Sequence, residues 1–215
     1  MDAETIARDK VALQVVWGRL IAIADEAAAT LRRTSFSPTV RESNDFACVV
    51  FDAAGNAMAE NTIGIPSFNM TLSRTLAHFL KVRPAGEWRD GDVGICNDPW
   101  LTSGHLPDIT LVAPVFAAGR LIGWTGSVAH QADLGGIGWA ADAHDVFEEG
   151  IRIPPMLLMK QGAITTEVEQ FIRANSRLPE LVMGDVAAQV AAGEAAARGL
   201  RDLLAREGID DLGPI

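Results

Sequence analysis

The first part of the chain changes from a helical pattern to an extended one and back. From Thr5 to Arg33, apolar side chains recur every three or four residues among charged ones, which predicts a long amphipathic helix. The Ser35–Pro38 segment ends this pattern. A second helix is predicted to begin at Pro66 and to end before Pro84, because a proline ring cannot continue a helix.

Short runs rich in β-branched and aromatic residues predict strands on both sides of the second helix. Asp52–Asn56 has turn chemistry and is predicted to join the first two strands as a hairpin. The tight turn Ala117–Arg120 joins the last two strands, so we expect these to pair in antiparallel fashion. The predicted strands are residues 46–51, 57–59, 93–97, 109–116 and 121–129.

Two central segments are rich in glycine and polar residues and show no clear period. These are Asp98–Asp108 and Gln131–Gly150. A long irregular stretch inside a compact domain is more often functional than idle, so the second segment is a candidate lid. An extended segment, Ile151–Pro155, follows it.

The last part of the chain is predicted to be helical again. Thr166 and Glu169 have the spacing of a capping box, which predicts a short helix there. Asp185–Arg206 is rich in alanine and predicts a longer helix that ends at Gly208. Taken together, the elements predict an α+β fold in which helices pack on a mainly antiparallel or mixed β-sheet.

Composition and charge narrow the classes of function. The 215 residues, 48% apolar and 21% charged, are enough for a packed globular core. The formal net charge is -10 and the basic residues are scattered, which argues against a nucleic-acid partner. The start of the chain is acidic, and no apolar run approaches the roughly 20 residues of a membrane helix. We expect a cytoplasmic protein with no nucleic-acid or membrane partner.

Several catalytic patterns are absent from the sequence. No Gly-x4-Gly-Lys-Ser/Thr loop is present, so any nucleotide would need another chain. No Gly-x-Ser-x-Gly elbow occurs, which excludes the common serine hydrolase pattern. Tyrosine is absent, so no phenol can act as acid or base. Cys48 and Cys96 lie in apolar segments and are predicted to be buried free thiols.

The strongest candidate for chemistry is a pair of histidines with a carboxylate. His105 and Asp108 are three residues apart, and Asp108 directly precedes a predicted strand. His130 ends the neighbouring strand of the predicted hairpin, so it returns toward Asp108. Two imidazoles and a carboxylate suit Zn, Mn or Fe better than Ca or Mg. At this point the simpler interpretation is a histidine and a carboxylate that satisfy each other in a turn.

The other polar candidates are weaker. His78 is predicted to be a solvated surface residue, and His144 is a minor candidate for a ligand or lid group. Asp45 precedes a strand, where an Asx turn is the simplest interpretation. Three residues flank the ligands of the candidate site and could orient them, namely Asp133, Asn97 and Asp98.

Several ordered motifs resemble the hydantoinase B/oxoprolinase family. The motifs are Asn97–Trp100, Gly104–Thr110, Ala129–Gly136 and Glu149–Pro155, preceded by Arg32–Pro38 and Asp45–Phe46 and followed by Ala174–Asn175, Arg177, Pro179, Gly184–Asp185 and Gln189. The resemblance covers essentially the whole chain. Members of the family are typically much longer, so residues 1–215 resemble the N-terminal part that carries the metal motif. We expect a truncated reading frame or a split subunit.

The resemblance implies a particular ligand set. Carried over residue by residue, the family's divalent metal ion would be held by Asp45, His105, Asp108 and His130. The site would be of the open catalytic type, with a position left for water. Asp133 is the candidate that steers this water, and a bond that orients His130 is the alternative.

The resemblance also implies an activity and a partner. The family includes the B-type component of ATP-dependent N-methylhydantoinase, the corresponding half of 5-oxoprolinase, caprolactamase, and components of acetone and acetophenone carboxylases. In these systems an A-type subunit carries the ATP and activates the substrate. The expected activity is therefore metal-dependent hydrolysis of a hydantoin, 5-oxoproline or another lactam, in a hetero-oligomer with a hydantoinase A-type subunit.

Two departures from the family pattern leave other functions open. Many ring-opening members have His-Ile-Pro-Val-His where this chain has Gly64–Phe68, and Gly-Gly-Thr-His where it has Thr102–His105. The alternatives are therefore a component of an ATP-dependent carboxylase that acts on a ketone, or an inactive assembly module.

Overall fold

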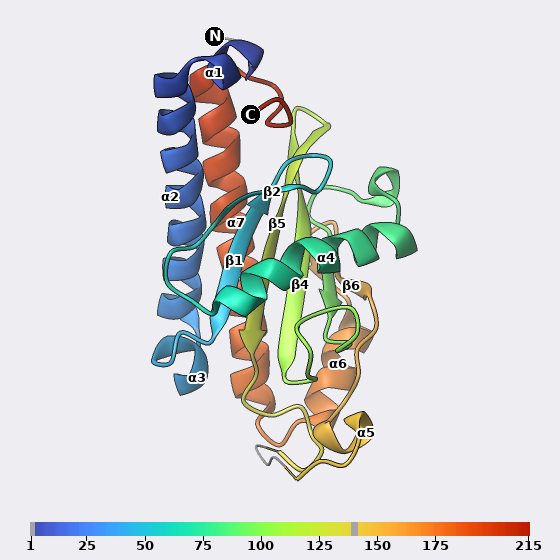
Figure 1. Ribbon diagram of the computed structural model, residues 1–215. Coiled ribbons are helices and arrows are strands. Elements are labelled where there is room, and N and C mark those ends of the chain that lie inside the picture. The colour runs from blue at the N-terminus through green and yellow to red at the C-terminus, as the bar shows by residue number, and fades with distance from the viewer. Residues whose placement is uncertain (1–2, 139–141) are drawn as a thin grey trace.

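The chain forms one antiparallel β-sheet with helices on both faces (Figure 1). The computed structural model describes residues 3–138 and 142–215, so residues 139–141 of the predicted Gln131–Gly150 loop lie outside the described residues. The strand order is β2-β1-β5-β4-β3-β6-β7, and every pairing within the described residues is antiparallel. The strands are β1 (Phe46–Phe51), β2 (Ala57–Glu60), β3 (Val93–Cys96), β4 (Asp108–Ala117), β5 (Arg120–His130), β6 (Met156–Lys160) and β7 (Ala163–Ile164).

The helices form two layers around this sheet. The long helices α2 and α7 lie side by side on one face, together with α6, whereas α4 crosses the other face (Figure 1). The predicted α+β fold with a mainly antiparallel sheet is therefore confirmed. The helices are α1 (Ala3–Arg8), α2 (Lys10–Thr34), α3 (Pro38–Arg41), α4 (Pro66–Val82), α5 (Val146–Glu149), α6 (Thr166–Asn175) and α7 (Pro179–Glu207), with a short 3-10 helix at Ala85–Glu87.

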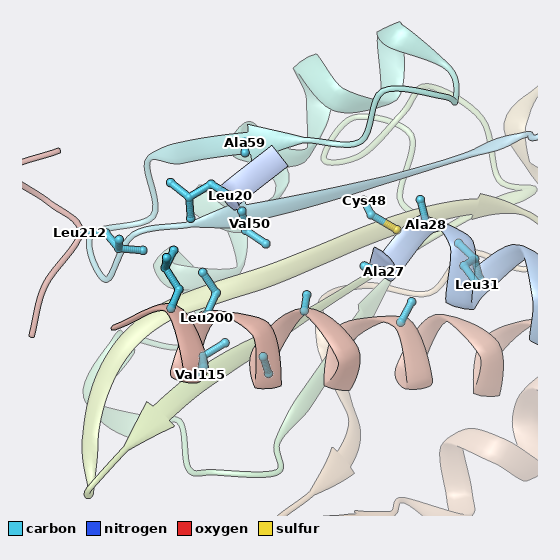
Figure 2. Packing of buried hydrophobic residues seen from close by; sticks show 14 of the residues in the cluster. Leu20, Ala27, Ala28, Leu31, Cys48, Val50, Ala59, Val115, Leu200 and Leu212 are labelled. Carbon is cyan, nitrogen blue, oxygen red and sulfur yellow. The ribbon is translucent and has the colours of Figure 1, made fainter. Parts of the chain in front are cut away.

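Strand β1 is buried on both of its faces. Cys48 and Val50 pack in the cluster between the sheet and helices α2 and α7, and Figure 2 shows both in this cluster. The alternate residues Val49 and Phe51 pack against α4. All six positions of β1 are buried, which explains why its sequence is a continuous apolar run rather than an alternating one.

The predicted first helix is divided in two by Asp9. Helix α1 ends one residue before Asp9, and α2 begins one residue after it. The Asp9 carboxylate accepts hydrogen bonds from the backbone N–H groups of Val11 and Ala12 at 2.9 and 3.1 Å. Aspartate is a favourable N-cap because it satisfies these otherwise free donors, so the helix restarts at this residue.

The predicted capping box before α6 is wrong, although the helix itself is present. The N-cap is Thr165 rather than Thr166, and its side chain makes no capping hydrogen bond. Glu169 instead accepts a hydrogen bond at 2.8 Å from the Nε of Arg173, one turn further along the helix. This pairing takes the carboxylate away from the helix start.

The C-terminal helix is longer than its alanine-rich core suggests. Helix α7 begins at Pro179 rather than at Asp185, with the proline in the first turn where its missing N–H costs nothing. It ends at Gly208 as predicted, because this glycine has φ 65° and closes the helix in the left-handed conformation.

Two tight turns organise the sheet. The predicted β4–β5 turn is confirmed, with Ala118 and Gly119 at φ 49° and 77°. A second hairpin, β6–β7, turns through Gln161 and Gly162 at φ 48° and 84° and has no counterpart among the predicted strands. Two successive positive φ values match the twist of the flanking strands. The strands of the second hairpin are short and lack alternation, so the sequence pattern does not indicate them.

Both cysteine predictions are confirmed. Cys48 and Cys96 are free and buried. Burial raises the pKa of each thiol to about 12, because it disfavours the thiolate. Among the described residues, no helix has the length and apolar composition that a bilayer span requires.

The packing of α2 against α7 gives a matched test of this fold. Val16 is 1% exposed and belongs to the cluster under α7, whereas its neighbour Val15 is 47% exposed. We expect Val16→Ala to lower the free energy of unfolding by about 2 kcal/mol, through lost burial and a residual cavity. Val15→Ala should change it by less than about 0.5 kcal/mol. Urea unfolding of both variants measures the difference, and equal effects would contradict this packing.

Candidate metal centre

The ends of three neighbouring strands meet at one end of the sheet. Asp108 begins β4 and pairs directly with His130, the last residue of β5. The first pair of the next ladder, Phe46 with Ala129, places Asp45 beside His130. The backbone N–H of His130 donates to the carbonyl oxygen of Asp45 at 3.1 Å. Strand register therefore brings together three polar residues that are far apart in the sequence.

A single carboxylate oxygen lies between the two imidazoles. Oδ1 of Asp108 is 2.8 Å from Nε2 of His105 and 3.0 Å from Nδ1 of His130. The two imidazole centroids are 5.0 Å apart. One ligand atom from each of the three residues lies within 4.8 Å of the others, which is compact enough for a shared ion. The sequence-predicted histidine and carboxylate set is thus brought together.

Asp45 borders this group but is not a member of it. Its Oδ2 is 3.9 Å from Nδ1 of His130. The pKa of Asp45 is raised, mainly because the residue is partly buried. The neighbouring His130 and His105 lower this pKa, whereas the negative charge of Asp108 raises it. Two carboxylates next to each other repel, and a cation beside them would offset this repulsion.

Asp108 is held in its ionised form. Burial alone would raise its pKa, but hydrogen bonds from His105, His130 and Ser103 outweigh burial and lower it. The Ser103 hydroxyl donates to Oδ2 of Asp108 at 2.8 Å. The same pairing with Asp108 raises the pKa of His105. The buried charge is therefore compensated from several directions, as a stable buried carboxylate requires.

The loop that carries His105 is fastened by Asn97. Nδ2 of Asn97 donates to the carbonyl oxygen of Leu106 at 2.6 Å and to that of Ile151 at 2.9 Å. Its Oδ1 accepts from the backbone N–H of Ile153 at 2.6 Å. Asn97 thus joins two loops through a fully used amide, and its orienting role for the histidines stays a prediction.

A cavity of about 380 Å³ opens beside the two histidines. His105, His130, Asp133 and Glu149 line it. The sequence places Glu149 within a family motif but does not single it out as a site residue. Its position in the irregular Gln131–Gly150 segment is the signal that could have indicated it.

A larger cavity of about 530 Å³ lies on the sheet face beside α7. Gln189, Thr125 and Gly193 are among its lining residues. Its described lining contains no histidine, so it lacks the chemistry of the smaller cavity.

Asp133 lines the smaller cavity, but its carboxylate is engaged by the segment between α6 and α7. Oδ1 of Asp133 accepts hydrogen bonds from Nε of Arg177 at 3.0 Å and from the backbone N–H of Gly135 at 3.3 Å. Oδ2 accepts from the Ser176 hydroxyl at 3.2 Å and from the backbone N–H of Arg177. Burial raises the pKa of Asp133, but the bonds from Arg177 outweigh it and lower the pKa. This clamp fixes the cavity wall that follows β5.

The two remaining histidines lie outside the ligand group. His144 is exposed and pairs with Glu148, with Nδ1 at 3.2 Å from Oε2. The surface prediction for His78 needs correction, because the residue is half-buried and its Nε2 is buried without a hydrogen-bond partner among the described residues. Burial, Lys81 and Arg74 lower the pKa of His78. This ring therefore lacks the full solvation expected of a surface histidine.

Helix α7 supports the segment that leads to Asp45. Oδ1 of Asp185 accepts from the backbone N–H groups of Phe36 and Ser37 at 2.7 and 3.1 Å, at the start of α3. A Cβ at Gly184 would lie 2.5 Å from the Phe36 ring, so a larger residue there would displace this ring. The backbone N–H of Asp45 then donates to the carbonyl oxygen at the second residue of α3.

The geometry defines a helix-flanked antiparallel domain with a His-Asp-His group beside a cavity. The chain belongs to the hydantoinase B/oxoprolinase family, whose model matches residues 9–213. It is 32% identical over 212 residues to the B-type component of a putative D-/L-hydantoinase from Pseudomonas sp. strain NS671. That match covers 94% of this chain and 35% of the relative.

Two solved structures have the same fold. A crystal structure of ATP-dependent caprolactamase from Pseudomonas jessenii matches with a TM-score of 0.79 and 30% identity, over 93% of this chain and 35% of that one. Nucleotide-free acetone carboxylase matches with a TM-score of 0.80 and 22% identity, over 94% of this chain and 27% of that one. The chain thus spans about a third of the hydantoinase and caprolactamase chains.

The Asp133 clamp predicts a pH-dependent loss of stability. Because the folded pKa of Asp133 is lowered, its pairing stabilises the fold above the ordinary carboxyl pKa of about 3.9 and is lost as the pH falls through the folded pKa. We expect Arg177→Ala to lower the urea midpoint at pH 7 and to approach the wild-type midpoint below about pH 4.

The exposed Arg198 of α7 provides the control for this comparison, because Arg198→Ala should leave the midpoint nearly unchanged at every pH. A difference between Arg177→Ala and wild type that stays constant from pH 7 to pH 3 would contradict the clamp.

Proposed function

We propose that this chain is the metal-dependent part of an ATP-dependent amidohydrolase. It acts on a cyclic amide, such as a hydantoin, 5-oxoproline or another lactam, after an A-type subunit has activated the amide. The observation that carries the proposal is the meeting of His105, Asp108 and His130 beside one cavity. Family membership supports the substrate class, because named relatives include a putative hydantoinase and a caprolactamase.

The donor set fits a divalent ion of the Zn, Mn or Fe type. Two imidazoles and an ionised carboxylate are ligands that these ions accept, whereas Ca and Mg favour oxygen alone. In this proposal His105, Asp108 and His130 hold the ion, and Asp45 completes the set from the edge of the group. Such an ion polarises a carbonyl oxygen and lowers the pKa of a water that it binds.

The protein groups have distinct tasks in this proposal. Asp108, which is 1% exposed, places one carboxylate oxygen between the two imidazole nitrogens, so that the three side chains converge on one point. His105 has a side chain that is 43% exposed and faces the cavity, so it adjoins the bound amide. Asp133 steers the attacking water or orients His130. Its carboxylate is bound by Arg177 and Gly135, which favours the second, positioning role.

The proposed partner carries the ATP. The sequence has no Gly-x4-Gly-Lys-Ser/Thr loop to bind the phosphates. Relatives are named as one part of a larger enzyme, such as the beta subunit of caprolactamase. The A-type subunit would phosphorylate the amide oxygen, and this chain would complete the ring opening in a cytoplasmic hetero-oligomer.

Removal of either proposed histidine ligand should abolish metal binding. We expect His105→Ala and His130→Ala to weaken the binding of Mn(II) or Zn(II) by more than about a hundredfold, because each loses a ligand and leaves the Asp108 charge less compensated. Isothermal titration at pH 7.5 measures the affinity, and metal analysis gives the number of ions bound by each chain.

The matched control is His144→Ala, which removes an exposed imidazole from the loop next to the cavity and should leave the affinity unchanged. Asp45→Asn should have an intermediate effect of about tenfold to a hundredfold. Wild-type affinity in both His105→Ala and His130→Ala would contradict the metal assignment.

The activity is tested by reconstitution with an A-type subunit, ATP and a divalent ion. We expect ring opening of a hydantoin, 5-oxoproline or a simple lactam, and loss of this activity with His130→Ala. Chromatography of the ring-opened acid measures the product. His144→Ala provides the same control. Incorporation of labelled bicarbonate into a ketone without lactam hydrolysis would overturn the proposal.

A further inference from the structure

Glu149 is a carboxylate in the metal cavity that the ligand set does not use. It is the last residue of α5 and lines the cavity together with His105 and His130. Its Oε2 accepts a hydrogen bond at 3.2 Å from the backbone N–H of Leu106, the residue after His105. One carboxylate oxygen therefore holds the histidine loop, although the two residues are 43 positions apart.

The backbone around Glu149 is fixed by the facing loop. The carbonyl oxygen of Glu148 accepts from the N–H of Ile137 at 2.9 Å, and the N–H of Ile151 donates to Leu134 at 2.9 Å. Any Cβ at Gly136 would lie 2.5 Å from the carbonyl carbon of Glu149, so the two segments pack backbone to backbone. A side chain on such a rigid support presents its oxygens in a defined direction.

Within residues 3–138 and 142–215, the Glu149 side chain makes one hydrogen bond, from Leu106 to Oε2, so its second oxygen is left without a donor. An ionised carboxylate only accepts hydrogen bonds, and its second oxygen can take a donor from a bound molecule. A secondary cyclic amide has such a donor, the ring N–H, next to the carbon atom at which the ring opens. A ketone has no N–H at that place.

We propose that Oε1 of Glu149 accepts the ring N–H of the cyclic amide and so selects secondary lactams. The inference rests on the proposed function, because it assumes that a cyclic amide occupies the metal cavity. Glu149 is thus a substrate-binding residue that determines specificity, with one oxygen for the histidine loop and one for the substrate. A hydrogen bond to a charged acceptor of this kind changes affinity by about tenfold.

Glu149→Gln separates the two tasks of this side chain. The glutamine has one amide oxygen, which can still accept from Leu106, and its NH2 group then faces the cavity as a donor. The fold and the histidine loop should be kept, while the N–H of a lactam would meet another donor. Glu148→Gln is the matched control, because Glu148 is an exposed neighbour that bonds His144.

The experiment compares two ligands on the Mn(II)-loaded chain. The probes are 2-piperidone, which has a ring N–H, and N-methyl-2-piperidone, which does not. Broadening of the ligand proton signals by bound Mn(II) reports binding in the metal cavity, and titration gives each affinity. Urea unfolding and Mn(II) titration of each variant verify the fold and the metal site.

We expect wild type and Glu148→Gln to bind 2-piperidone about tenfold more tightly than its N-methyl analogue. The preference should fall below about twofold in Glu149→Gln. Equal affinities of wild type for the two ligands, or a preference that Glu149→Gln retains, would overturn the role of Glu149 and leave the proposed function standing. If wild type binds Mn(II) but neither ligand, or no Mn(II), the proposed function fails and this inference with it.

Discussion

The candidate site depends on one buried oxygen atom. Oδ1 of Asp108, a residue that is 1% exposed, bonds both His105 and His130. A carboxylate buried in this way is costly unless its partners are correctly placed, and the loss of one partner leaves a charge without compensation. The geometry of the two imidazoles is therefore tied to the position of Asp108 rather than to each histidine separately.

The sheet fixes that position through strand register. Asp108 and His130 are direct partners in the β4–β5 ladder, so a slip by one residue would carry one side chain to the opposite face. Such a slip is disfavoured because both faces of the sheet are covered. Trp124 of β5 is fully buried under α4, while Ala129 packs on the side of α2 and α7. The apolar core thus sets the site by holding the register.

Contacts between residues that are close in the sequence could be predicted, whereas contacts between distant residues could not. The β4–β5 hairpin is local, its turn has recognisable chemistry, and the pairing of Asp108 with His130 follows from it. Arg177 pairs with Asp133 across 44 residues, and no periodicity or motif spacing could indicate that contact. The sequence therefore predicts a catalytic role for Asp133 but does not reveal that Arg177 already binds its carboxylate. Such contacts depend on how loops meet after the core has formed.

Helix α7 supplies no ligand of its own, but it contacts the chain next to three of the four proposed ligands. Asp185 bonds the start of α3, which leads to Asp45. Nε2 of Gln189 donates to the carbonyl oxygen of Ile109 at 3.0 Å, one residue after Asp108. Oε1 of Gln189 lies 3.4 Å from Nε2 of Gln131, one residue after His130.

One helix therefore contacts the segments that carry three of the four proposed ligands. Asp185 and Gln189 are one turn apart on α7, are both almost fully buried, and lie on the same face of the helix. A change in the seating of α7 would shift α3, β4 and the end of β5 together. The candidate metal centre thus depends on helix α7. Asp185 and Gln189 support the site because they bond the segments that carry its ligands to one rigid helix.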